Sequence, residues 1–336
     1  MMHQPPTAYD AVTYMPAALG WHGAEVRITA LQSGFVAQAF LLEVDAHQAF
    51  VKCYDRERAI TARMLRSNEF ALPVSAWAVA HTPLRGRMTA PFATTAGTFT
   101  VDMGRFVCVA FDYWQGVMPC AQPLSATHVE HLATTIAWLH RSTSQVPWPA
   151  HVEREDFSAR WDASLAAYLG SGWGQLAGDL HAVVAPYRTA LRQMHARFGA
   201  VAAQLQHQVV PLVLCHTDIH CMNMLVDADQ TVLLDIEGLK LAPPEHDFMF
   251  VWDEPHWPQW YAAYQRICGE TPVDAQRLRF YQERRVLEDI YEWIEQVVSE
   301  SPEGAERQEI FDGMTRLLQF VFAKKTPTTP DSEWSV

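Results

Sequence analysis

Three oxygen-bearing side chains stand in the most polar stretch of the sequence. Asp218 and Asn223 follow the apolar run 209–215, and Asp235 ends the strand-like run 231–234. A polar turn at 227–230 predicts a β-hairpin that brings Asn223 opposite Asp235. Carboxylate and amide oxygens suit Mg²⁺, and a carboxylate outside the metal shell can accept a hydroxyl proton. The pattern indicates phosphoryl transfer, with Asn223 and Asp235 on the metal and Asp218 facing the nucleophile.

Zinc binding is the rival interpretation of the same stretch. Its candidate ligands are Cys215, His216, His220 and Cys221. Their spacing matches no common structural zinc site, and zinc would leave the arrangement of Asn223 and Asp235 unexplained. We therefore interpret the two histidines as braces of a catalytic loop.

The surrounding elements change character along the chain. Strand-like runs at 39–44, 49–53, 99–103 and 106–111 dominate the first third, with a short helix expected from about 55 to 66. Apolar residues recur at helical spacing beyond residue 111. This order predicts an α+β protein with two lobes, a β-rich N-lobe over 1–111 and a helical C-lobe over 112–336.

Composition limits the partners and the compartment. The 336 residues carry a formal net charge of −13 and show no cluster of Lys and Arg, which argues against a nucleic-acid partner. The balance suits a small cationic substrate, although acidity also serves solubility alone. We see no signal peptide or membrane-spanning run, and the six cysteines lack a framework spacing. We expect a cytoplasmic protein with reduced thiols.

Several motifs together resemble a known family. The pattern His216-x-Asp218-x-His220-x-x-Asn223, followed by Asp235, resembles the aminoglycoside phosphotransferase family, whose fold is that of the protein kinases. The continuation 234–250 and the helix 283–290 look most like the spectinomycin phosphotransferase branch, and 139–142 (Leu-His-Arg-Ser) resembles the family's usual helix end. The resemblance is strong over the C-terminal two-thirds and weak in the first hundred residues.

This resemblance implies roles for the catalytic and nucleotide-binding residues. Asp218 would be the catalytic base, while Asn223 and Asp235 would hold Mg²⁺. Lys52 would contact the α- and β-phosphates of ATP or GTP, with Glu57 as its ion-pair partner and Glu69 as the other option.

Two further segments would bind the nucleotide. The chain from Phe111 to Tyr113 would be the hinge that offers backbone groups to the base. The loop over the phosphates is expected at 32–38, where Ser33 and Gly34 stand, and it holds a single glycine. A glycine-rich loop lets backbone N–H groups approach phosphates closely. With one glycine, the loop at 32–38 departs from the family pattern.

Substrate residues are the least defined part of the prediction. Asp253, Glu254 and Trp257 lie in a segment rich in Trp and Tyr, which would suit an aminocyclitol ammonium or would simply pack in the core. By resemblance alone, the further candidates are Glu237, Glu288 and Asp289.

The function expected from the resemblance is Mg²⁺-dependent phosphorylation of an aminoglycoside or aminocyclitol hydroxyl, with spectinomycin as the first acceptor. The sequence leaves open whether antibiotic resistance is the biological role or a side activity of a metabolic enzyme. A metabolite kinase of the same fold, acting on choline, homoserine or a sugar, is the first alternative. A pseudokinase that only binds is the second; Lys52 and the catalytic residues argue against it, and the single loop glycine argues for it. The sequence does not define the oligomeric state.

Overall fold

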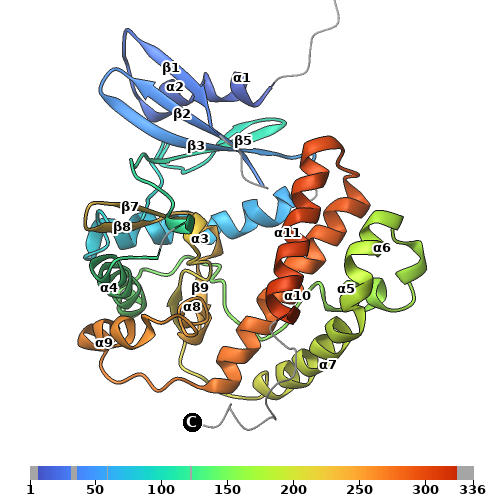
Figure 1. The fold of residues 1–336 in the computed structure, drawn as a ribbon. Helices are drawn as coiled ribbons and strands as arrows, with labels where there is room; N and C mark the ends of the chain where they lie inside the picture. The colour runs from blue at the N-terminus through green and yellow to red at the C-terminus, as the bar shows by residue number, and fades with distance from the viewer. Residues whose placement is uncertain (1–6, 32–35, 59, 122, 324–336) are drawn as a thin grey trace, which may run out of the picture. The chain divides into compact units, whose positions relative to one another are not determined.

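A five-stranded antiparallel sheet forms the N-terminal part, with strand order β1-β2-β3-β5-β4 (Figure 1). The computed structural model describes residues 7–31, 36–58, 60–121 and 123–323. Its strands are β1 (Val26–Ala30), β2 (Gln38–Val44), β3 (His47–Asp55), β4 (Val101–Met103) and β5 (Phe106–Asp112). Alternating apolar side chains of β2, β3 and β5 pack one face against α1 (Ala8–Val12) and α2 (Met15–Leu19).

The helix expected from about 55 to 66 is wrong in its bounds. Strand β3 continues to Asp55, which pairs with Phe106 of β5, and the helix α3 (Thr61–His81) begins only after a turn. The Thr61 hydroxyl donates to the Asp55 carbonyl at 2.6 Å and closes that turn. Residues 55–58 therefore belong to the strand end and the turn, not to a helix.

The chain divides into two units, of which the first combines Met1–Glu155 with Val210–Val273. Besides the sheet and α3, this unit holds a helix pair, α4 (Ala126–Ser142) and α9 (Trp257–Cys268), which pack together. Its remaining elements are η1 (Pro119–Ala121), β6 (Val213–Cys215), η4 (Cys221–Asn223), β7 (Met224–Asp227), β8 (Gln230–Leu233), η5 (Ile236–Gly238), β9 (Lys240–Ala242) and α8 (Glu245–Phe248).

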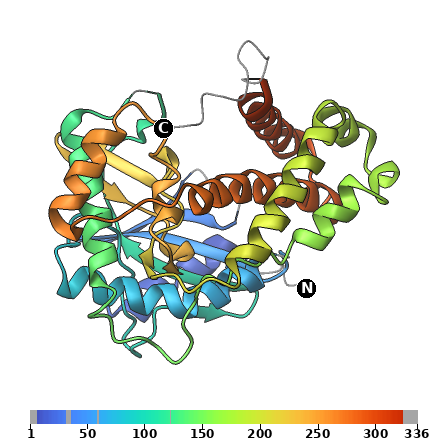
Figure 2. The same cartoon turned by 90° about the horizontal axis from the view of Figure 1, so that it is seen from below.

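The second unit combines Asp156–Val209 with Asp274–Val336 and is helical where described. Its elements are α5 (Asp162–Leu169), η2 (Trp173–Gln175), α6 (Gly178–Val184), η3 (Ala185–Tyr187), α7 (Arg188–Leu205), α10 (Ala275–Ser299) and α11 (Gly304–Ala323). Helix α10 packs on α7 and on α11, as Figure 2 shows for these long rods. The mixed architecture predicted from the sequence is confirmed. The lobe boundary expected at residue 111 falls inside the first unit and stays a prediction.

Four cysteines are paired, which corrects the expectation of six reduced thiols. Cys53 of β3 lies opposite Cys108 of β5 in the sheet, with a Cα–Cα distance of 4.3 Å, and the two form a disulfide. A second disulfide joins Cys120 of η1 to Cys221 of η4. The paired residues are 55 and 101 positions apart, so only the strand register and the meeting of two loops bring them together.

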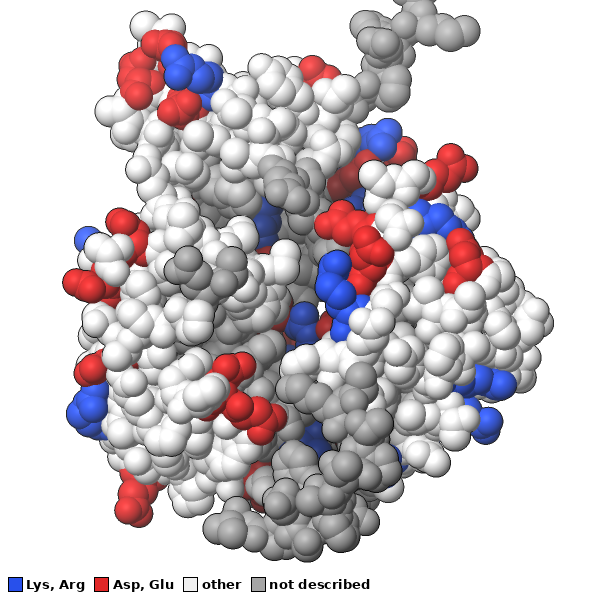
Figure 3. Space-filling view, in the orientation of Figure 1, with Lys and Arg blue, Asp and Glu red and all other residues white. Residues whose placement is uncertain are grey.

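Charged side chains are interspersed on the face that Figure 3 displays. Over its described residues, Lys and Arg alternate with Asp and Glu, and no continuous basic area forms on this face. Within the described chain, no helix combines the length and the hydropathy needed to cross a bilayer.

Candidate active site

Asp218 and Asn223 meet in the loop that follows β6. The Asn223 amide nitrogen donates to Asp218 Oδ2 at 2.8 Å and to the Asp218 carbonyl at 3.0 Å. His220 Nε2 lies 3.3 Å from Asp218 Oδ1. The Asp218 side chain keeps 30% of its surface exposed, so it is oriented by its neighbours and still open to a substrate.

The hairpin β7–β8 carries Asn223 and Asp235 at one end, but with a register one residue from the expected one. Met224 pairs with Leu233, and the Leu234 N–H donates to the Asn223 carbonyl at 2.9 Å. Asn223 thus lies opposite Leu234, and Asp235 follows it. The reason is the turn at 228–229, which fixes the partner of Asn223 as residue 234.

Lys52 reaches this hairpin end from the sheet. Its Nζ lies 2.5 Å from Asp235 Oδ1 and 2.6 Å from Glu237 Oε1. Burial disfavours the charged lysine, but the two carboxylates hold the pKa of Lys52 well above its ordinary value. Burial and the neighbouring Asp235 raise the pKa of Glu237 to about 7, against the pull of Lys52. Burial also acts against ionised Asp235, yet Lys52 lowers its pKa.

Glu57 is not the partner of Lys52, which corrects the expectation from the resemblance. It lies in the turn before α3, with 68% of its side chain exposed, and pairs with Arg105 at 2.9 Å. The other option, Glu69, lies on α3 but is exposed. Because β3 runs on to Asp55, the fifth residue after the lysine is already past the strand and cannot turn back to it.

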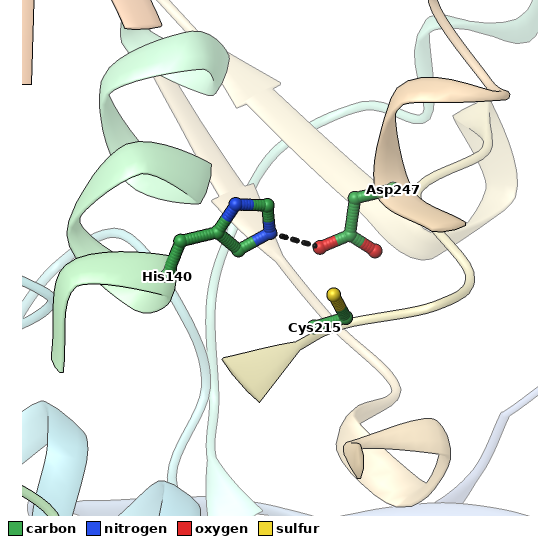
Figure 4. Close-up of side chains that lie close together, drawn as sticks. All are labelled: His140, Cys215 and Asp247. Atoms are coloured by element: carbon green, nitrogen blue, oxygen red, sulfur yellow. Dashed lines mark hydrogen bonds and ion pairs between the residues drawn. The ribbon is translucent and has the colours of Figure 1, made fainter. Parts of the chain in front are cut away.

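Asp247 of α8 braces the start of the loop that carries Asp218. Its Oδ2 accepts from the His216 N–H at 3.0 Å, and its Oδ1 accepts from the Thr217 N–H at 2.6 Å. His140 Nε2 completes the set at 2.9 Å from Oδ2 (Figure 4). Burial works against ionised Asp247, but these hydrogen bonds, led by His140, hold its pKa below the usual range.

Figure 4 also places the Cys215 sulfur beside this pair, and the three residues could be taken for a metal site. Their donor atoms are already engaged, however. His140 Nδ1 lies 2.9 Å from the Tyr264 hydroxyl, and Cys215 Sγ lies 3.4 Å from the Ala242 carbonyl. We therefore interpret the cluster as structural.

The four residues of the zinc alternative do not converge either. Cys221 is bonded to Cys120, and Cys215 faces backbone carbonyls. His216 Nε2 lies 2.8 Å from the carbonyl of Leu234, next to Asp235, as expected of a brace.

Thr217, the residue before Asp218, carries a strained backbone. Its φ of 73° is unusual for a β-branched residue, and such strain persists only where neighbours enforce it. Besides the bond to Asp247, its hydroxyl donates to the Gly238 carbonyl at 2.9 Å. A Cβ at Gly238 would lie 3.1 Å from the His216 carbonyl and closer still to the Thr217 hydroxyl. The glycine therefore permits the close approach of η5 to the loop.

The nucleotide segments predicted from the sequence are only partly described. Phe111 is buried in β5, with Lys52 Nζ 5.9 Å from its ring centroid, and Tyr113 follows the strand half-buried. Their contribution of backbone groups to a base stays a prediction. Ser33 and Gly34 of the expected phosphate loop lie outside the described residues.

The substrate candidates are scattered among different environments. Trp257 is half-buried and stacks on Trp260 and Tyr261, within a group of aromatic rings that packs around Phe248. Core packing therefore accounts for this aromatic segment.

The acidic candidates differ in exposure. Asp253 and Glu254 are exposed just before α9, whereas Glu237 is enclosed. In the second unit, Glu288 pairs with Arg284 at 3.7 Å and Asp289 with Arg285 at 3.0 Å. Burial raises the pKa of Asp289 to about 6 despite that arginine.

The residues at the hairpin end fit a magnesium ion. The Asn223 side chain uses its nitrogen in its hydrogen bonds, which leaves the amide oxygen for a cation. Asp235 supplies a carboxylate with 42% of its surface exposed. Two hard oxygen donors with open positions are what Mg²⁺ shared with phosphates requires.

Removal of the Asp235 charge should therefore weaken the binding of Mg²⁺. We expect Asp235→Asn to raise the Mg²⁺ concentration for half-maximal ATP turnover by about tenfold or more. A Mg²⁺ titration of turnover measures this, with Asp227→Asn, an exposed residue of the same hairpin, as control. An unchanged titration in Asp235→Asn would remove this residue from the metal site.

Comparison with known proteins places this geometry in a family. The sequence profile of the phosphotransferase enzyme family (APH) matches residues 27–281. A search of curated proteins found no match.

Solved structures share the fold at low identity. A spectinomycin phosphotransferase, APH(9)-Ia, in complex with ADP and spectinomycin is 19% identical with a TM-score of 0.69, covering 96% of this chain and 99% of that one. A microcompartment-associated aminopropanol kinase is 16% identical with a TM-score of 0.56, covering 95% and 100%. An amicoumacin kinase in complex with AMP-PNP and Ca²⁺ is 14% identical with a TM-score of 0.58, covering 96% and 95%.

The profile match spans most of the chain and includes Lys52, the loop of Asp218 and Asn223, and Asp235. The family predicted from the motif is confirmed, together with the kinase-like fold. The chain belongs to the phosphotransferase enzyme family and is a small-molecule phosphotransferase.

Proposed function

We propose that this protein transfers the γ-phosphoryl group of ATP or GTP, with Mg²⁺, to a hydroxyl of an aminocyclitol or aminoglycoside, and that spectinomycin is the first acceptor to test. Two contacts support the proposal most directly: the hydrogen bond from Asn223 to Asp218, and the ion pair between Lys52 and Asp235. These residues supply a proton acceptor, two metal ligands and a phosphate-binding cation on connected elements.

In the proposed reaction, Asp218 accepts the proton of the acceptor hydroxyl. The hydroxyl oxygen forms a bond to the γ-phosphorus while the bond from that phosphorus to the bridging oxygen breaks, and the nucleoside diphosphate leaves. Lys52 binds the phosphates, and Asn223 and Asp235 would hold Mg²⁺, which neutralises charge on the transferred group. Because little covalent chemistry falls to the protein, positioning by the braced loop supplies most of the rate.

The acceptor class is supported by the motif resemblance and by the acidic balance of the chain. An aminocyclitol is cationic, and a net charge of −13 favours its approach. Asp253 and Glu254 are exposed acidic residues of the first unit that could contact an ammonium group. An amino alcohol or another small metabolite is the alternative, since an aminopropanol kinase shares the fold. We propose a cytoplasmic location, because the reaction would consume a nucleoside triphosphate from the cytoplasm.

A panel of acceptors tests the proposal. Purified protein would be incubated with Mg²⁺ and ATP or GTP together with spectinomycin, several aminoglycosides, a macrolide, aminopropanol, choline or homoserine, and products would be read by mass. Efficient phosphorylation of spectinomycin or an aminoglycoside, with protection of a susceptible bacterium that expresses the protein, supports the proposal. Phosphorylation of only an amino alcohol overturns the acceptor class. Nucleotide binding without transfer to any acceptor favours a binding role.

A further inference from the structure

The ion-pair partner of Lys52 comes from an unexpected element. Lys52 and Tyr54 are two residues apart on β3, so both side chains project from the same face of the strand. Val51 and Cys53 project from the opposite face into the core beneath α1 and α2. Lys52 and the buried Tyr54 both reach Glu237 Oε1 of η5, the lysine at 2.6 Å and the tyrosine through its hydroxyl. One carboxylate oxygen thus accepts from two residues of a single strand.

Helix α3 supplies no competing carboxylate. Its only acidic residue is Glu69, which is exposed. Glu57 lies before the helix and forms an ion pair with Arg105. The polar residues that α3 buries are Thr61, Asn68 and Ser75, and all three are uncharged. Helix α3 packs against η5, and η5 carries the carboxylate that contacts the lysine.

The two acids that contact Lys52 differ in exposure. The Asp235 side chain is 42% exposed, whereas Glu237 is 2% exposed. An exposed carboxylate at the hairpin end can exchange the lysine for a cation when nucleotide binds. An enclosed carboxylate has no water to replace the lysine, and separating a buried ion pair is costly. We therefore expect Glu237 to stay on the lysine when nucleotide binds.

We propose that Glu237 is the positioning residue that holds Lys52 toward the nucleotide phosphates, and that the Tyr54 hydroxyl fixes Glu237 for that task. The inference deepens the proposed function, since it relies on Lys52 as the phosphate-binding residue. It replaces the substrate role that the sequence suggested for Glu237. It also relocates the lysine anchor from the helix after β3 to η5, two residues beyond the metal-binding Asp235.

A double-mutant cycle tests whether Glu237 acts through Lys52. Glu237→Gln keeps the shape of the side chain and removes its charge. We expect it to weaken binding of a fluorescent ATP analogue, and to raise the KM for ATP, by about 10- to 100-fold, because a misplaced lysine loses its phosphate contact. In a Lys52→Met background the same change should alter both values by less than about twofold, because the two residues act as a unit. A purely structural role would produce the same loss in both backgrounds.

Matched variants keep the inference falsifiable. Tyr54→Phe leaves Glu237 in place and should weaken analogue binding in the same direction by a smaller factor, which covers the case that Glu237→Gln does not fold. Glu43→Gln on the neighbouring strand β2 should bind as the parent protein does. Full affinity in a folded Glu237→Gln, or a loss in Glu57→Gln or Glu69→Gln instead, overturns the inference. Binding needs no acceptor, so the cycle can succeed even where the panel finds no aminocyclitol kinase.

Discussion

Replacement of Asp218 by alanine should lower phosphate transfer by about 100- to 10,000-fold, the range that a positioned general base supplies. The nucleotide affinity should fall by a much smaller factor, because Lys52, which would bind the phosphates, is held by Asp235 and Glu237. Asp218 contacts Asn223 and His220 of its own loop. Single-turnover kinetics at saturating ATP would measure the transfer step, and binding of a fluorescent ATP analogue would measure affinity.

Two variants separate the charge of Asp218 from its shape. Asp218→Asn preserves a side chain that can bond with Asn223 but cannot take up the acceptor proton, so it should lose nearly as much transfer as Asp218→Ala. Asp229→Ala removes an exposed acid from the β7–β8 turn and should leave transfer unchanged. Near-normal transfer in either Asp218 variant would show that another group accepts the proton.

Local sequence patterns were sufficient to predict that the candidate catalytic residues meet. Asp218, Asn223 and Asp235 occupy one loop and one hairpin, so their meeting follows from short-range spacing. The strands β2, β3 and β5 were predictable for a similar reason, since apolar runs bounded by polar turns predict strands. The predicted hairpin register is wrong by one residue. The two-residue turn at 228–229 puts Asn223 opposite Leu234, whereas the prediction put it opposite Asp235.

Pairings between distant elements could not be predicted. Lys52 and Glu237 are separated by 185 residues, and nothing in either neighbourhood indicates that β3 faces η5. The resemblance implies a partner on the helix after β3, but that helix begins at Thr61, beyond Glu57. The disulfides Cys53–Cys108 and Cys120–Cys221 depend in the same way on strand register and loop contact. An acidic residue in the mainly apolar stretch directly after Asp235 is the sequence signal that would have pointed to Glu237.

Loss of Asp247 should damage both the stability and the activity of the protein. Asp247 is fully buried and accepts from His140, His216 and Thr217. In Asp247→Ala these three donors lose their acceptor inside the protein, and breaking such a buried charged network costs about 3–5 kcal/mol of unfolding free energy. Asp247→Asn should recover only part of this, because its amide nitrogen would face N–H donors. Urea unfolding of the variants and of Glu270→Gln, an exposed control, measures the difference.

The activity of the folded fraction shows whether Asp247 also orients Asp218. Thr217 keeps its positive φ while Asp247 and Gly238 bind it, and Asp218 follows directly in the chain. Without Asp247, Thr217 should relax toward an ordinary conformation and turn Asp218 away from Asn223. Transfer per folded molecule should then fall by about 100-fold, the effect of a 1 Å misplacement. If Asp247→Ala lost stability but transferred phosphate normally below its unfolding transition, Asp247 would hold α8 in place without orienting the catalytic aspartate.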